Sequence, residues 1–205
     1  MGRLKEGILL LRKLWGDEKV DHRGRFYTLE GYQILPKPAQ KPPPIWIAVS
    51  PDRAEVGDRV VDQAMRRVGS IADGYITMGV TPEEFRRRWE VIEATATELG
   101  RDLESFETSI HGMVNINDSK RRAYEESKFY FSHYYGPSYP TEEMIKVWLA
   151  HGPPEECARL IQSWIDMGIT TPVLRFTSKD QLGQMSRFIH EVLPLLRLSR
   201  AGQSG

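Results

Sequence analysis

Apolar residues along the chain occur in two patterns, short unbroken runs and longer stretches with helical spacing. Four apolar runs have the length of a buried strand: residues 45–49, 74–78, 106–114 and 173–176. Between them, apolar residues recur every three or four positions, as in the stripe formed by Phe85, Trp89, Ile92, Ala96 and Leu99. The pattern predicts four core strands, each followed by helix. This order indicates either an α/β barrel or a doubly wound parallel sheet.

The segment from residue 42 to residue 77 contains the clearest unit of this kind. Three prolines force an extended entry into the first strand, and Ser50-Pro51 turns the chain after it. A helix and a second strand, which begins at Gly74, complete a βαβ unit. Ligands in such folds bind at the carboxyl ends of the strands. We therefore expect a binding site where the two strands end, near Ser50 and Thr77.

The chain outside these strands carries further local signals. Residues 4–15 have the spacing of an amphipathic helix, and residues 20–35 are typical of a β-hairpin or of two short extended segments. Thr81 and Thr141 each precede a helical stretch and are predicted to be its N-cap. The last helix places five apolar residues on one face: Leu182, Met185, Ile189, Val192 and Leu196. Because no repeat, charge block or low-complexity linker interrupts the chain, we expect residues 1–205 to form a single domain.

Charge and composition narrow the functional classes. The chain has 205 residues, with 28 Lys plus Arg and 28 Asp plus Glu, so its net charge is zero. No global field attracts nucleic acid or an anionic membrane. The single cysteine, Cys157, excludes an intrachain disulfide framework and suggests a reducing compartment. Since there is no signal-peptide pattern and no apolar run near the length of a membrane span, the sequence predicts a cytoplasmic protein.

Candidate catalytic and metal-binding side chains are sparse. None of the five histidines stands in a spacing typical of a metal site. His111 lies within a predicted strand, where it either packs in the core or rim or points into a barrel mouth. Cys157 has no evident base partner and is interpreted as a small buried hydrophobe. The basic runs 86–88 and 120–122 are flanked by acidic residues and are interpreted as solvated helix faces.

Several short motifs together resemble one protein family. In chain order they are Glu6-Gly7-Ile8 to Leu14-Trp15, Gly24-Arg25-Phe26-Tyr27, Pro36-Lys37-Pro38-Ala39-Gln40, Pro43-Pro44-Ile45-Trp46-Ile47, Ala72-Asp73-Gly74-Tyr75, Gly152-Pro153-Pro154-Glu155-Glu156 and Glu191-Val192-Leu193-Pro194. Their order and spacing resemble the bacterial luciferase-like family of flavin- or deazaflavin-dependent oxidoreductases. The resemblance implies an α/β fold of the TIM-barrel type. It also identifies residues 4–15 as similar to the family's fourth barrel helix, so the chain resembles a carboxyl-terminal half barrel.

The implied half barrel sets expectations about partners. A TIM barrel usually needs about 250 residues, and the family's first four βα units have no counterpart in this chain. We expect four core strands with their helices and a β-hairpin insertion. The two open edges of such a sheet tend to pair with another chain. The resemblance therefore predicts a homo-oligomer or a complementary half-barrel partner; a truncated gene or a start assigned too late are the alternatives.

The resemblance also implies a cofactor site at the end of the first strand. Ser50 matches the phosphate-contacting serine of the luciferase branch, and Arg53 falls where that branch has a threonine. Many relatives have a Gly-Gly pair at the positions of Ala48-Val49, and the valine crowds close approach to the backbone. An exposed turn before a helix suits an anion, although Ser50 equally fits as the cap of a turn. The predicted cofactor-binding residues are Ala48, Val49, Ser50, Arg53 and Thr77.

Two functions remain as alternatives. The first is an oxidoreductase or monooxygenase that transfers hydride or oxygen through FMN or coenzyme F420, acts on a small molecule and needs the amino-terminal half. In this class the cofactor carries the chemistry, which accounts for the lack of an acid–base constellation, and the motifs favour the deazaflavin branch. The second is a non-catalytic half barrel, an assembly partner or a remnant. An aromatic cluster at residues 129–139 is interpreted as pocket wall or half-barrel interface, with plain core as the alternative.

Overall fold

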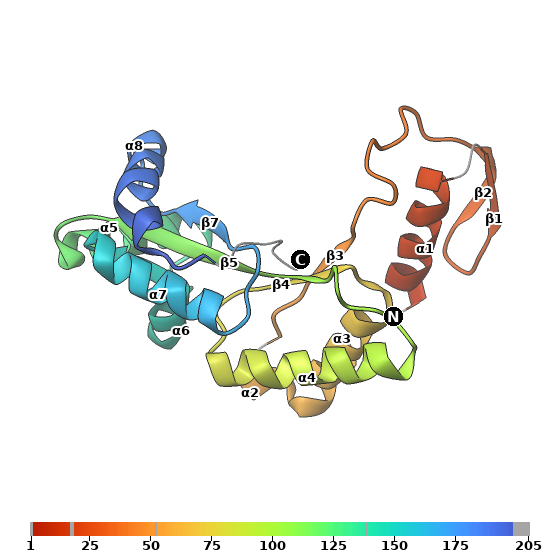
Figure 1. The fold of residues 1–205 in the computed structure, drawn as a ribbon, viewed down its shortest axis with the longest axis horizontal. Helices are drawn as coiled ribbons and strands as arrows, with labels where there is room; N and C mark the ends of the chain where they lie inside the picture. Colours follow the sequence, from red (N-terminus) through yellow and green to blue (C-terminus); the bar gives the residue numbers. More distant parts are fainter. Residues whose placement is uncertain (1, 17–18, 52, 138, 199–205) are drawn as a thin grey trace, which may run out of the picture.

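The structure is a computed structural model that describes residues 2–16, 19–51, 53–137 and 139–198. Its elements in chain order are α1 (Gly2–Gly16), β1 (Val20–Arg23), β2 (Thr28–Tyr32), β3 (Trp46–Ala48), α2 (Arg53–Val56), α3 (Asp58–Ile71), β4 (Gly74–Thr77), α4 (Pro82–Glu98), β5 (Glu107–Ile116), α5 (Lys120–Tyr134), α6 (Glu142–Trp148), β6 (Leu149–Gly152), α7 (Pro154–Asp166), β7 (Val173–Phe176) and α8 (Gln181–Arg187). Figure 1 shows the sheet as an open arc, with α3 and α4 beneath one part of it and α5 to α8 around the other.

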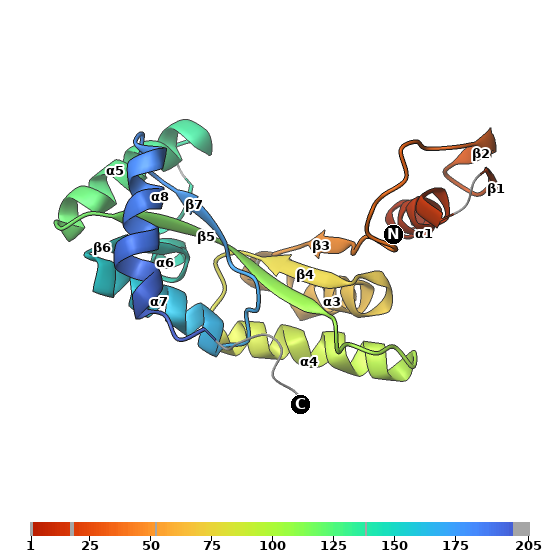
Figure 2. The ribbon, with the colours of Figure 1, turned by 45° about the horizontal axis from the view of Figure 1, so that its top comes forward.

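Within the described residues, the central sheet has five parallel strands, and the sequence predicts four of them: β3, β4, β5 and β7. Trp46 in β3 lies opposite Gly74 in β4, and β4 pairs with the first half of β5. The second half of β5 pairs with β7, with His111 opposite Val173. These are the four predicted strands, and they lie side by side in chain order (Figure 2). This order agrees with a barrel and not with a doubly wound sheet, in which the strand order reverses.

The strand β6 is the one element of the sheet that the sequence pattern does not predict. It follows α6 without an intervening loop and pairs with Met113–Ile116 of β5. No turn signal separates helix from strand, because the apolar residues of α6 continue directly into Leu149 and Ala150. β5 also ends at Ile116, beyond the predicted residue 114, since β6 and β7 both pair with this end and bury it.

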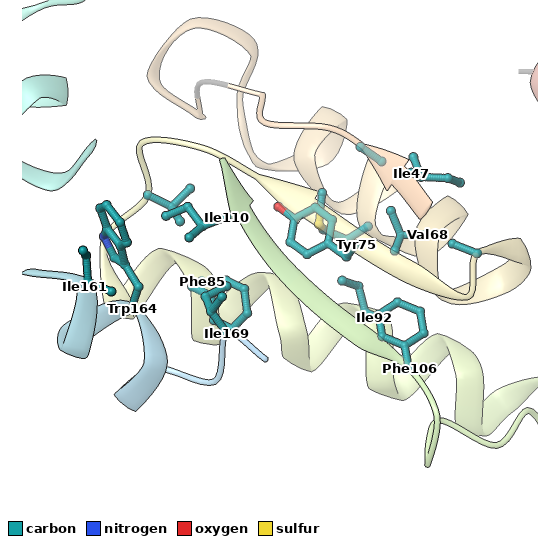
Figure 3. Packing of buried hydrophobic residues seen from close by; sticks show 14 of the residues in the cluster. Ile47, Val68, Tyr75, Phe85, Ile92, Phe106, Ile110, Ile161, Trp164 and Ile169 are labelled. Carbon is teal, nitrogen blue, oxygen red and sulfur yellow. The ribbon is translucent and has the colours of Figure 1, made fainter. Parts of the chain in front are cut away.

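The main core lies between the sheet and its helix layer. Tyr75 of β4 and Ile110 of β5 are fully buried among residues of α3, α4 and α7. Val68, Ile92 and Trp164 are the corresponding large contacts from those three helices (Figure 3). The apolar stripes of the helices therefore cover one face of the sheet, as their spacing predicts. The other face is the inner face of the arc.

Local signals in the sequence are confirmed at several element ends. Thr81 and Thr141 each accept a hydrogen bond from the backbone N–H three residues later, at 3.2 Å. Residues 20–32 form an antiparallel hairpin of β1 and β2, which decides between the two forms predicted. The helix α5 begins at Lys120, directly after Ser119, whose hydroxyl accepts the capping hydrogen bond from the Arg122 N–H.

The prediction of one continuous last helix is wrong. α8 ends at Arg187 and is followed by a π-helical turn (Phe188–Val192) and a 3-10 turn (Leu193–Leu195), in which Pro194 lacks the N–H that an α-helix needs. The apolar residues share a face, but that face is largely uncovered. Val192 is buried, whereas Leu182 is 75% exposed and Met185 and Ile189 are exposed. Val192 belongs to the main core and Leu196 packs against it, so the stripe is covered at its carboxyl end and exposed at Leu182, Met185 and Ile189.

Candidate functional site

The carboxyl ends of β3 and β4 lie side by side and bring two predicted site residues together. The Ser50 hydroxyl donates a hydrogen bond to the carbonyl oxygen of Met78 at 2.7 Å. The Thr77 hydroxyl donates to the Ser50 oxygen at 3.2 Å. Ser50 is half-buried and Thr77 is buried, and their hydrogen bond connects the ends of the two strands. We call these residues, together with Arg88 described next, the strand-end network.

Arg88 of α4 holds the strand-end network from the helix side. Its side chain is 3% exposed, and its guanidinium donates to the hydroxyls of Tyr75 and Thr77 at 3.1 Å each. It also donates to the Pro51 carbonyl at 2.9 Å and forms an ion pair with Glu84 at 2.9 Å. The interpretation of the whole basic run 86–88 as a solvated face is therefore wrong at Arg88.

A signal for this burial is present in the sequence. Arg88 lies three residues after Phe85 and four before Ile92, so it falls on the apolar stripe of α4. The neighbouring Arg86 is exposed, as predicted. A charged residue on a buried stripe needs partners, and the Tyr75 and Thr77 hydroxyls on β4 supply two of them.

The remaining predicted site residues differ in what they offer a ligand. Ala48 is exposed at the end of β3, and the Val49 N–H donates to the Ile76 carbonyl at 3.1 Å. The Ser50 N–H has no acceptor among the described residues. The hydroxyl proton of Ser50 is already used on Met78, so this side chain offers lone pairs and not a proton. Arg53 begins α2, and its side chain lies outside the described part of the structure.

The aromatic cluster after β5 divides into two parts. Phe131 and Trp148 stack with ring centroids 5.5 Å apart and are buried, so they are core. Phe129 and Tyr134, in contrast, are 51% and 54% exposed.

His111, on β5, is half-buried, and burial together with the nearby Arg175 lowers its pKa. Both effects disfavour the charged form of His111.

Two acidic residues of the family-like motifs have structural roles at the opposite end of the sheet. Asp73, just before β4, accepts hydrogen bonds from Arg12 of α1 at 2.8 Å and from the Ile45 N–H at 2.9 Å. Glu6 of α1 accepts hydrogen bonds from the backbone N–H groups of Phe26 and Tyr27 in the hairpin loop, at 2.9–3.2 Å. These bonds tie α1 to the sheet and to the hairpin. Neither carboxylate lies near the strand-end network.

Other candidate chemistry is not assembled in the part of the chain that the structure describes. No group of three His, Cys, Asp or Glu residues there is placed to hold a metal ion. Cys157 is buried, and this burial raises the pKa of its thiol to about 12. The thiol is therefore protonated and packed, as the sequence predicts. None of the described helices combines the length and apolarity needed to cross a membrane.

Sequential parallel strands with helices on the outer face, and a polar cluster at their carboxyl ends, define part of a (βα) barrel. A model of luciferase-like monooxygenases matches residues 1–171, and the chain belongs to this family. Among curated relatives, the F420-dependent glucose-6-phosphate dehydrogenase of Kineococcus radiotolerans is 27% identical over 95% of this chain and 60% of its own length. The enzyme of the same name from Nakamurella multipartita is 25% identical over the same shares. The chain thus spans about 60% of these relatives.

Solved structures agree on the fold. An F420-dependent secondary alcohol dehydrogenase in complex with an F420–acetone adduct matches with a TM-score of 0.77 and 20% identity, over 94% of this chain and 60% of that chain. A Baeyer–Villiger monooxygenase component from Pseudomonas putida in complex with FMN matches with a TM-score of 0.64 and 16% identity, over 97% of this chain and 64% of that one. The expected partial TIM barrel is confirmed.

Proposed function

We propose that this chain is the carboxyl-terminal part of an F420-dependent oxidoreductase that transfers a hydride between the deazaflavin and a small organic molecule. One observation carries the proposal: 95% of the chain aligns with F420-dependent dehydrogenases at 25–27% identity. The fold match to an F420-dependent alcohol dehydrogenase supports it. FMN is the alternative cofactor, with oxygen transfer as the alternative reaction, because an FMN-containing monooxygenase has a similar fold.

The strand-end network fits an anionic cofactor tail in a specific way. The Ser50 N–H, which has no acceptor among the described residues, would hold the tail, with the small, exposed Ala48 leaving access; Arg53 is added from the sequence alone. The Ser50 hydroxyl is not among the donors, because its proton is bonded to Met78. Thr77 would act by fixing Ser50 in place rather than by binding. When bound, F420 would supply the hydride-carrying ring, and the protein would orient it.

A binding titration tests the proposal. The purified chain is titrated with F420 and, separately, with FMN, and the change in cofactor fluorescence is followed. We expect saturable binding of F420, and at least about tenfold weaker binding in Ala48→Glu, because the new carboxylate repels an anionic tail. The matched control is Ala94→Glu, the same substitution at an exposed position of α4. Binding of FMN alone would replace F420 in the proposal, and binding of neither would contradict it.

The non-catalytic alternative is favoured by the open sheet and by the exposed apolar side chains of Leu182 and Met185 on α8. Light scattering combined with the cofactor titration separates the two functions. The monomer has a mass of 23.6 kDa, so the measured mass gives the number of chains in the particle. An oligomer, or a complex with a complementary half-barrel chain, that binds F420 supports the enzyme. A stable assembly that binds no cofactor supports the assembly partner.

A further inference from the structure

A cavity of about 560 Å³ lies between one face of α5 and the segment that follows β7. Its lining residues are Glu126, Phe129, Tyr130, His133, Tyr134, Thr177, Ser178 and Lys179. The five residues from α5 recur every three or four positions and so form one helix face. β7 is parallel to β3 and β4. The cavity therefore lies at the carboxyl edge of the sheet, the same edge as the strand-end network. We call it the α5–β7 pocket.

The wall of the α5–β7 pocket is aromatic. Tyr130 and Tyr134 stack with an interplanar angle of 9° and ring centroids 5.8 Å apart. The ring centroids of Phe129 and His133, which also lie on α5, are 4.0 Å apart. Aromatic rings that stay half-exposed around a cavity present a flat apolar surface of the kind that binds planar or apolar ligands.

Two cations lie against this wall: Lys179 is itself a lining residue, and Arg175 is outside the lining but contacts two of its rings. The guanidinium of Arg175 on β7 is 4.2 Å from the centroid of the Tyr134 ring and 5.9 Å from that of Tyr130. The ammonium of Lys179 is 5.3 Å from the centroid of the Phe129 ring. The rings hold both charges in place through cation–π contacts.

Neither cation forms an ion pair with a carboxylate among the described residues, in contrast to Arg187, which pairs with Asp118 and Glu191. The one carboxylate in the lining, that of Glu126, is engaged by Asn115 at 3.0 Å and by Ser178 at 2.7 Å. A hydrogen bond to Tyr134 raises the pKa of Arg175 further, so its charge persists at any physiological pH. The aromatic wall thus carries positive charge that the described part of the protein leaves unneutralised.

We propose that the α5–β7 pocket binds an anionic organic molecule, with its planar or apolar body on Phe129, Tyr130 and Tyr134 and its carboxylate or phosphate held by Lys179 and Arg175. Assigning this molecule as the substrate rests on the proposed function; the binding itself does not. The class of ligand follows from the pairing of an aromatic wall with two cations that have no carboxylate partner among the described residues. A neutral apolar ligand would leave both charges without a partner, and a small inorganic anion would leave the wall empty.

Binding of three probes with one ring system tests the proposal. The full chain is titrated with 2-naphthoate, 2-naphthyl phosphate and the neutral 2-naphthamide by calorimetry, without any cofactor. We expect at least one acid to bind at least about tenfold more tightly than the amide, because a charge-assisted hydrogen bond contributes this much. The tighter of the two acids identifies the acid group as carboxylate or phosphate.

Variants identify the groups that recognise the probe. Lys179→Met and Arg175→Met are each expected to weaken binding of the tighter acid about tenfold and to leave the amide unchanged. Phe129→Ala is expected to weaken all three probes. Lys146→Met is the control, since this exposed lysine pairs with Glu143 and is not in the pocket lining. Arg175→Lys keeps the charge and covers the case in which the methionine variant does not fold.

Three outcomes overturn the proposal: no probe binds at millimolar concentration, the acids bind no better than the amide, or loss of both cations has no effect. The F420 titration is independent of these probes. Acid binding without F420 binding would contradict the proposed function and leave the pocket assignment standing. F420 binding without acid binding would contradict the pocket assignment and leave the proposed function standing.

Discussion

Replacement of Arg88 by methionine should destabilise the fold, even though it reduces the repulsion between the three adjacent positive charges at residues 86–88. Methionine keeps an unbranched apolar stem of similar length, so the packing of the aliphatic part is largely retained. What is lost is the guanidinium, which donates to Tyr75, Thr77 and Pro51 and pairs with Glu84. The hydroxyl of Tyr75 and that of Thr77 are both buried and lose a donor.

The magnitude follows from the burial of these partners. Removing one member of a buried ion pair costs about 3–5 kcal/mol, and a buried polar group that loses its partner costs about 1–3 kcal/mol. The Glu84 side chain is 19% exposed, so water partly hydrates its carboxylate after the substitution. We therefore expect a loss of about 3 kcal/mol, near the lower end of the range.

Urea unfolding followed by far-UV circular dichroism measures this loss. With a slope of about 3 kcal/mol per molar urea, the midpoint should fall by about 1 M. Arg86→Met is the matched control, two residues earlier in the same helix, exposed and without an ion pair among the described residues; its effect should stay within about 0.5 kcal/mol. If Arg88→Met loses less than about 1 kcal/mol, roughly a third of the expected value, the strand-end network is not a buried structural unit.

Two further predictions concern other parts of the molecule. Cys157 should resist thiol reagents in the folded chain at pH 8 and react on unfolding, since burial raises its pKa to about 12. The folded state keeps a proton that the unfolded thiol releases near pH 9, so the stability it contributes is present below that pH and is lost as the pH rises towards 12. The pH dependence of the urea midpoint, compared with that of Cys157→Ala, checks the sign, and equal slopes would refute it. Asp73→Ala should cost about 2 kcal/mol, because a carboxylate bonded to Arg12 and a backbone N–H is removed; Arg23→Ala, at the exposed pair with Glu30, should cost less than about 0.5 kcal/mol. Equal losses in the last two variants would contradict this difference.

The strands were predictable because a buried parallel strand has a continuous apolar run with turn residues on both sides. Thr81 and Thr141 were predictable because capping depends on the local sequence alone. The strand β6 was not, since Leu149 continues the apolar spacing of α6 and no turn residue marks the change. The apolar stripe of α8 was predictable from its spacing, but the 75% exposure of Leu182 was not, because spacing does not show which neighbours pack on a face.

The candidate site was predictable in position and not in chemistry. Parallel strands end at one edge, so the proximity of Ser50 and Thr77 follows from topology alone. Their chemistry depends on tertiary contacts, because Arg88 donates to the Thr77 hydroxyl from α4 and the Ser50 hydroxyl donates to the Met78 carbonyl across the strand ends. The two cations of the α5–β7 pocket meet the aromatic wall only through tertiary structure, because Arg175 lies about forty residues after Tyr134.

The motifs that predicted the family so well are a poor guide to the site, and the structure shows why. Glu6 and Asp73 bind α1 to the hairpin and to the amino-terminal end of β4. In a barrel, residues at that end maintain the fold, whereas the carboxyl ends of the strands carry the chemistry. At the carboxyl end this chain has Ala48-Val49 where the family resemblance implies glycines, together with the Arg175–Lys179 pair on an aromatic wall. The family motifs therefore account for structural contacts at the amino-terminal end of the sheet. The ligand must be determined from the side chains at the carboxyl end.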